Sequence, residues 1–245
     1  MPIEWQIQTL RLTGFNNRIT AGFQQDWWRT LFGQPPDERI SKPKTIGFRE
    51  ESEFNGAKLT LTLQLGRVDW LMSAILSEED DQTIPSFGPF PEAQVGFSDL
   101  MVRWFKIAPP FQRIAFGAIL IGPVGDGPEG YRKLIEYLKP VTLDPMNSSD
   151  FFYQINRPRM SGIMDGLKIN RLSKWGVMSW KQSEISMGPG KMQYNPGHDS
   201  FACALELDIS TAAGNQGEFP PELSGRIFDE LTILGKEIAL QGDIR

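Results

Sequence analysis

Alternating apolar and polar positions predict strands in the first half of the chain. Residues 3–12 alternate and then change phase, which indicates a strand with a bulge. Residues 45–54 and 58–70 also alternate, and the Asn55-Gly56 pair between them is a dipeptide strongly favoured in tight hairpin turns. One face of this hairpin is rich in leucine and the other is polar, so one face must be buried and the other wet.

Apolar positions three and four residues apart predict helices. Residues 19–33 have this spacing around two tryptophans, and a glycine followed by two prolines ends the pattern. The clearest helix covers residues 220–240, which begin with two prolines and carry one apolar stripe. Two further helices are predicted over residues 98–108, with Ser98 as the N-cap, and over residues 129–140.

Loops and further strands complete the pattern. Residues 77–97 are acidic and then rich in proline and glycine, which predicts a loop, and a second Gly/Pro-rich loop is predicted over residues 186–199. The remaining strands are predicted over residues 111–122, 150–158, 166–185 and 200–210.

The two halves of the chain follow the same order: strand, helix, strands, helix. We therefore expect an α+β fold of mostly antiparallel sheets with helices on one face. The two similar halves would be residues 1–108 and residues 109–245, the second ending in the C-terminal amphipathic helix. The alternative is one mixed sheet in which the similarity is accidental.

Two short segments carry the similarity between the halves. Residues 63–73 and 167–179 share the order arginine, tryptophan, methionine, serine, so that Arg67 would correspond to Arg171 and Trp70 to Trp175. Tryptophan and methionine at the end of a strand fill cores far more often than they contact ligands. Both tryptophans are therefore expected to be buried.

Composition limits the compartment. The chain has 245 residues, of which 40% are hydrophobic and 22% charged, so it can bury a sizeable core without disulfides or metals. Its single cysteine, Cys203, excludes an internal disulfide, and its longest apolar stretch is about half of what a membrane span requires. Because no basic and apolar leader begins the sequence, we expect a cytoplasmic protein with no membrane partner.

The chain has only one histidine and one cysteine, which limits metal binding and catalysis by these residue types. One histidine and one cysteine cannot build a zinc site, so neither a metal nor another cofactor is predicted. Cys203 lies in an alternating strand and is expected to pack in the core. His198, Asp199 and Ser200 are consecutive, whereas the members of a catalytic triad converge in space, so a loop is the better interpretation.

Two loops match ligand-binding patterns only formally. Residues 125–130 satisfy the glycine pattern of dinucleotide-binding loops. However, Asp126 and Glu129 would place negative charge where phosphates need positive potential, so a flexible turn is favoured. For the acidic run at residues 77–81, a solvated loop is favoured over a cation site.

The segment from residue 157 to residue 181 is strongly basic. It carries six cations and one anion, a formal charge of +5 in a chain whose net charge is −5. Interleaved aromatic residues could stack bases beside such cations, whereas the alternative is a solvated strand face. Arg171 lies on the opposite strand face from Lys168 and Lys174. Its correspondence with Arg67 suggests a structural partner, for example a carboxylate under the sheet. The candidate ligands for an anion are Arg157, Arg159, Lys168, Lys174 and Lys181.

The second half resembles a sporadically distributed prokaryotic protein family of about this length. The blocks that carry the resemblance include RIAFGAILIG, YRKLIEYLKP, LKINRLSKW and the closing IFDELTILGKEIALQGD. The resemblance implies a prokaryotic cytoplasmic protein and transfers no active-site residues. A patchy distribution is typical of defence or conflict systems, which is an association rather than a mechanism.

Three functional hypotheses follow. The first is a non-catalytic binding or assembly subunit of a prokaryotic complex, with a protein partner or a second copy of the chain. The second is a nucleic-acid or nucleotide-binding module that uses the basic segment. The third is an enzyme that relies on carboxylates such as Asp144, Asp150 or Asp165, with no catalytic residue assigned.

Overall fold

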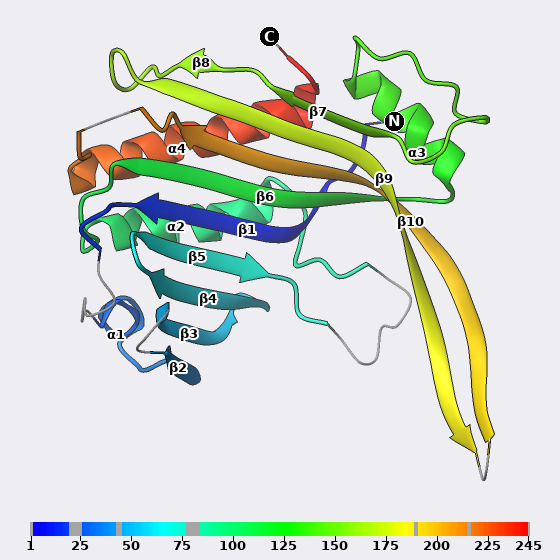
Figure 1. The fold of residues 1–245 in the computed structure, drawn as a ribbon, viewed down its shortest axis with the longest axis horizontal. Coiled ribbons are helices and arrows are strands. Elements are labelled where there is room, and N and C mark those ends of the chain that lie inside the picture. Colours follow the sequence, from blue (N-terminus) through cyan, green and yellow to red (C-terminus); the bar gives the residue numbers. More distant parts are fainter. Residues whose placement is uncertain are drawn as a thin grey trace.

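The computed structural model describes residues 2–19, 26–42, 46–76, 84–188, 191–214 and 217–244, apart from the side chains of residues 42, 46 and 181–198. The described residues form four helices and one ten-stranded antiparallel sheet (Figure 1). This confirms the expected α+β class with a mostly antiparallel sheet.

The elements have the following bounds. The strands are β1 (Gln6–Phe15), β2 (Glu38–Lys42), β3 (Ile46–Phe54), β4 (Ala57–Gln64), β5 (Arg67–Ser73), β6 (Arg113–Val124), β7 (Phe152–Asn156), β8 (Arg159–Met160), β9 (Lys168–Gly188) and β10 (Lys191–Thr211). The helices are α1 (Trp27–Phe32), α2 (Glu92–Phe105), α3 (Gly127–Tyr137) and α4 (Pro221–Gln241).

The sheet runs in the order β2-β3-β4-β5-β1-β6-β10-β9-β7, and β8 also pairs with β9. β1 and β6 lie side by side in the middle, in a ladder that runs from Gln6 and Ile121 to Phe15 and Arg113. The sheet is therefore continuous across the boundary between residues 108 and 109. A register shift after Ile7 is the bulge that the change of phase in the first strand predicted.

The strand positions of the two similar segments differ. Trp70 lies on β5, which pairs with β1, whereas Trp175 lies on β9, which is separated from β6 by β10. The expected correspondence of Trp70 with Trp175 is therefore wrong at the level of strands. Both tryptophans are fully buried, as expected.

The core lies between the sheet and the two long helices. Figure 1 shows α2 and α4 behind the sheet, and α2 contacts β1 while α4 contacts β6, β10 and β9. Phe228 of α4 packs against Phe97 and Phe105 of α2 and against Phe116 of β6. Rings at such distances add edge and offset contacts to the burial of apolar area.

Two tight turns show where the sequence pattern predicted the strand ends correctly and where it did not. Asn55 and Gly56 both have positive φ, as the predicted tight hairpin between β3 and β4 requires. The single strand expected over residues 58–70 is in fact two strands, because Gly66, at a φ of 73°, allows a second tight turn. Leu65 continues the leucine alternation in sequence but is 73% exposed in this turn.

Two helices differ from their predicted bounds. α2 begins at Glu92, so Ser98 lies inside the helix and is not its N-cap. The described part of the first predicted helix begins at Trp27, and Gly33 ends it in the left-handed conformation, as expected. The acidic run at residues 77–81 lies outside the described residues.

The largest correction concerns residues 186–199, which were expected to form a loop. β9 and β10 are each 21 residues long and remain paired up to Gly188 and Lys191. Beyond the other strands they form a two-stranded projection, which we call the arm and define as residues 180–200 (Figure 1). Prolines and glycines mislead here because a hairpin tip and a bulged ribbon edge both tolerate them.

Candidate functional site

The cations at the start of the basic segment bind carboxylates near the end of the chain. Arg157 donates two hydrogen bonds of 2.7 Å to Asp243. Arg159 donates to Glu237 of α4 at 3.2 Å. Pattern analysis could not find these pairs, because their members lie about eighty residues apart.

The lysines later in the segment differ in whether a carboxylate binds them. Lys174 donates to Glu206 on the neighbouring strand at 2.8 Å. Lys168 is exposed, and among the described residues no ion pair involves it. The side chain of Lys181 lies outside the described residues. Carboxylates of the same chain therefore bind Arg157, Arg159 and Lys174. This reduces the positive charge that the segment offers to a ligand.

Arg171 is buried on the side of the sheet that faces α4. Its side chain is 2% exposed and lies 3.9 Å from Glu237, which is the structural carboxylate partner expected from the sequence. Removal from water lowers the pKa of Arg171 from its ordinary value. Arg171 is therefore part of the packing between β9 and α4.

Asp243 is the centre of a second buried contact. Besides Arg157, the hydroxyl of Tyr153 donates to its carboxylate at 2.7 Å, and the carboxylate side chain is 1% exposed. The hydrogen bonds from Arg157, together with that from Tyr153, hold the pKa of Asp243 below its usual value. This network joins the chain end to β7.

The glycine-rich loop is a helix cap. Asp126 accepts a hydrogen bond from the backbone amide of Glu129 at 2.7 Å, and Glu129 accepts one from the amide of Gly125 at 2.7 Å. Protein carboxylates thus already occupy amides that a phosphate would need. A methyl group at Gly130 would also approach Val177 to 2.7 Å, so close packing accounts for that glycine.

The carboxylates considered for catalysis have local partners or stand in exposed loops. Asp144 accepts from Asn147 and from the amide of Met146, and Ser149 donates to Asp150. Asp165 is exposed. Within the described ranges, no three histidine, cysteine or acidic side chains gather closely enough to hold a metal ion.

Cys203 is buried, as expected, in the small space between β10 and α3. Its thiol donates a weak hydrogen bond of 3.5 Å to the carbonyl of Gly130. Burial raises the pKa of Cys203 to about 12. A thiol with this pKa is not a nucleophile near neutral pH.

The arm has two unpaired edges. Among the described residues, no strand pairs with the outer edge of β9 beyond Gly176 or with that of β10 before Phe201. The nine residues on the β9 side, 180–188, span roughly 30 Å at the usual rise of a strand. An isolated two-stranded hairpin is at best marginally stable in water.

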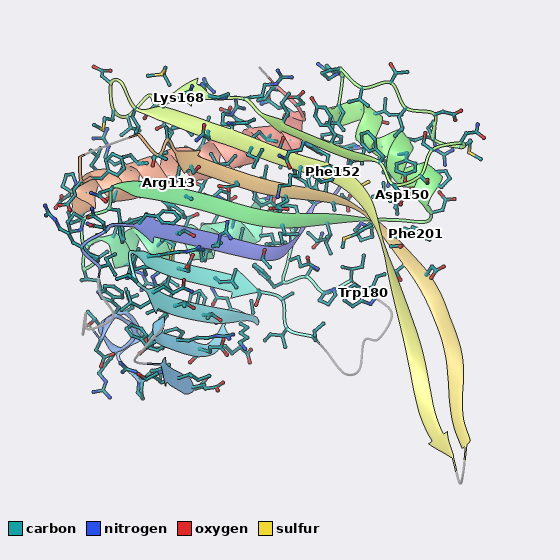
Figure 2. The ribbon with its side chains drawn as sticks, in the orientation of Figure 1. Arg113, Asp150, Phe152, Lys168, Trp180 and Phe201 are labelled. Carbon is teal, nitrogen blue, oxygen red and sulfur yellow. The ribbon has the colours of Figure 1, made fainter. Side chains whose placement is uncertain are left out.

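Two exposed aromatic residues stand where the arm leaves the sheet (Figure 2). Phe152 on β7 is 64% exposed, and Trp180 on β9 is 41% exposed. The register places Phe152 opposite Gly176, four residues from Trp180 along β9, so both residues lie on the same face of the sheet. Sequence alone could not separate these two from the many buried aromatic residues of the chain.

Comparisons with protein-family models, with curated proteins and with solved structures find no match to this chain. Of the helices in the described residues, none combines the length and apolar character that crossing a bilayer requires.

Proposed function

We propose that this protein is a non-catalytic binding or assembly subunit, and that the arm is the element that holds its partner. The arm carries the proposal. Among the described residues, no other strand pairs with either edge of the arm, and an isolated two-stranded ribbon is at best marginally stable in water. A protein partner that pairs with an edge would complete its hydrogen bonds and order it.

The residues at the base of the arm support a protein as the partner. Phe152 and Trp180 offer exposed aromatic surface, which is enriched at the centres of protein interfaces.

In this proposal the subunit belongs to a prokaryotic cytoplasmic complex, as the resemblance of the second half implies. Membership of a defence or conflict system rests on the same resemblance and on nothing in the site. The nucleic-acid alternative is weakened, because carboxylates of the chain already bind Arg157, Arg159 and Lys174.

We also propose that the two halves are copies of one unit, in a correspondence different from that of the tryptophan segments. Outward from the central β1 and β6, β5 and β10 come next, followed by β4 and β9 and then by β3 and β7. α2 and α4 close the two halves and pack against each other. The matching order of elements supports duplication where the matching residues do not.

The arm can be removed without disturbing the sheet. Lys181 and Asp199 are paired, so an Asn-Gly turn that replaces residues 182–198 would close the ribbon with a tight hairpin. We expect the shortened protein to melt at the parent temperature, because no other strand in the described part of the chain pairs with the removed segment. In the native host, the parent should elute with a stoichiometric protein partner or as an oligomer, and the shortened protein should elute alone as a monomer.

Point variants test the contribution of the residues at the base of the arm to partner binding separately from that of the rest of the arm. Phe152→Ser and Trp180→Ser should each weaken the association, whereas Met146→Ser, at an equally exposed residue in the loop before β7, should leave it unchanged. A parent that is monomeric and elutes alone would contradict the proposal, as would a shortened protein that keeps the same partner with the same affinity.

A further inference from the structure

A cleft of about 500 Å³ opens on the face of the sheet turned away from α2 and α4. It lies over β1, β3, β4 and β5, with Ile40 of β2 at its rim. Three arginines, Arg11, Arg49 and Arg67, line it together with Leu71. The volume is in the range of sites that bind small organic molecules.

Two of the three arginines have carboxylate partners. Arg49 pairs with Glu51, which also accepts a hydrogen bond from Thr60. Arg67 pairs with Asp69 at 2.6 Å. Within each pair, the carboxylate neutralises the charge of the arginine, and the contact fixes both side chains in the wall of the cleft.

Arg11 is different. None of the ion pairs or side-chain hydrogen bonds between described residues involves it, and its Nε is buried without a hydrogen-bond partner. The guanidinium lies beside Gly117, where a methyl group in place of the glycine hydrogen would come within 3.2 Å of Nε of Arg11. On the other side of Gly117, β10 places Asp208 opposite this glycine. Asp208 and Arg11 form no ion pair, and Oδ1 of Asp208 has no hydrogen-bond partner among the described residues. Arg11 as a whole is half-buried, and a small anion would supply the acceptor that its Nε does not find among the described residues.

The other side chains that line the cleft indicate which chemical group the anion is attached to. Leu71 pairs with Arg11 across β5 and β1, and Ile40 stands at the rim, so apolar side chains lie beside the cation. Thr62 and Gln64 add polar groups to the floor. The described lining contains no aromatic side chain on which a base could stack.

We propose that this cleft binds a small aliphatic anion, an alkyl carboxylate or an alkyl phosphate. The guanidinium of Arg11 receives the head group through charge-assisted hydrogen bonds, and the alkyl chain lies against Leu71 and Ile40. This site is independent of the arm and of its partner.

Isothermal titration calorimetry of the full chain with decanoate, decyl phosphate and inorganic phosphate tests the proposal and distinguishes the head groups. We expect saturable one-to-one binding of decanoate, decyl phosphate or both, with weaker binding of inorganic phosphate and none of decanol. Arg11→Met keeps the length of the side chain and removes its charge. It should weaken binding by about tenfold or more, the loss expected for a charge-assisted hydrogen bond. Arg132→Met, the same change at an exposed position of α3 outside the lining of the cleft, should leave binding unchanged.

A second variant guards against a simple folding defect. Leu71→Glu places a carboxylate directly opposite Arg11, so it should abolish binding of both decanoate and decyl phosphate while the melting temperature stays the same or rises. Absence of saturable binding by the parent at millimolar concentrations would overturn the proposal. Undiminished binding by a folded Arg11→Met or Leu71→Glu variant would overturn it equally.

Discussion

At the scale of single residues, Asp243 gives the clearest dependence on pH. Arg157 and Tyr153 hold its pKa below the ordinary value, so the folded state binds its proton less readily than the unfolded chain. Its contribution to stability is therefore complete above the unfolded pKa of about 4 and disappears as the pH falls through the lower folded pKa. We expect Asp243→Asn to lower the free energy of unfolding by about 2 kcal/mol at neutral pH.

Urea denaturation of the parent and of Asp243→Asn, at neutral pH and at about pH 3, measures this effect. The difference between the two proteins should shrink in acid. Asp165→Asn, at an exposed loop position, is the control and should match the parent at both pH values. A difference of the same size at both pH values would show that the carboxylate charge is not what stabilises the contact.

Residues whose role follows from strand alternation could be predicted, and residues whose role depends on a distant partner could not. The strand patterns correctly predicted that Trp70, Trp175 and Cys203 are buried. They gave no means of knowing that Asp243 binds Arg157, because nothing local links the end of a helix to a strand eighty-six residues earlier. Arg11 was missed for the same reason, since the residues that line the cleft around it come from five strands.

At the scale of elements, the basic segment gives a direct test of the nucleic-acid alternative. If this segment binds a nucleic acid, Lys168→Glu combined with Lys174→Glu should abolish filter retention of single-stranded nucleic acid at low salt. The fold should remain intact with a slightly lower melting temperature, because the new carboxylate at position 174 faces Glu206. Arg171→Glu should instead lower stability by about 3 kcal/mol, because it places a buried carboxylate beside Glu237. Absence of retention by the parent at low salt would exclude the alternative.

Elements with a strong local pattern were predictable, and connections between them were less so. The stripe of α4 and the Asn55-Gly56 turn are local, and both have the expected structure. The turn at Gly66 interrupts an unbroken leucine alternation, and the arm continues through a stretch rich in proline and glycine. In both cases the pairing of whole strands overrides the preferences of the residues within them.

At the scale of the whole molecule, the two chain ends meet at one tyrosine. The amide of Ile3 donates to the hydroxyl of Tyr137 at 3.0 Å, and the amide of Asp243 donates to the carbonyl of the same residue at 2.9 Å. The indole of Trp5 also donates to the carbonyl of Ala239. Ile3 and Asp243 therefore both contact the last residue of α3, and a Gly/Ser linker can join the two ends of the sequence.

A circular permutant tests whether residues 1–108 and 109–245 are structural units. Joining the ends with a short Gly/Ser linker and opening the chain between Ala108 and Pro109 keeps every element of each half contiguous and only reverses the order of the halves. We expect this permutant to melt in one cooperative transition with the circular dichroism of the parent, because the central ladder between β1 and β6 already joins residues far apart in sequence. Opening instead between Leu65 and Gly66 separates β4 from β5 and should lower the melting temperature further, because a local hairpin becomes a long-range pairing. Equal destabilisation by the two openings would contradict the division into halves, since the boundary at residues 108 and 109 would then be no different from any other turn.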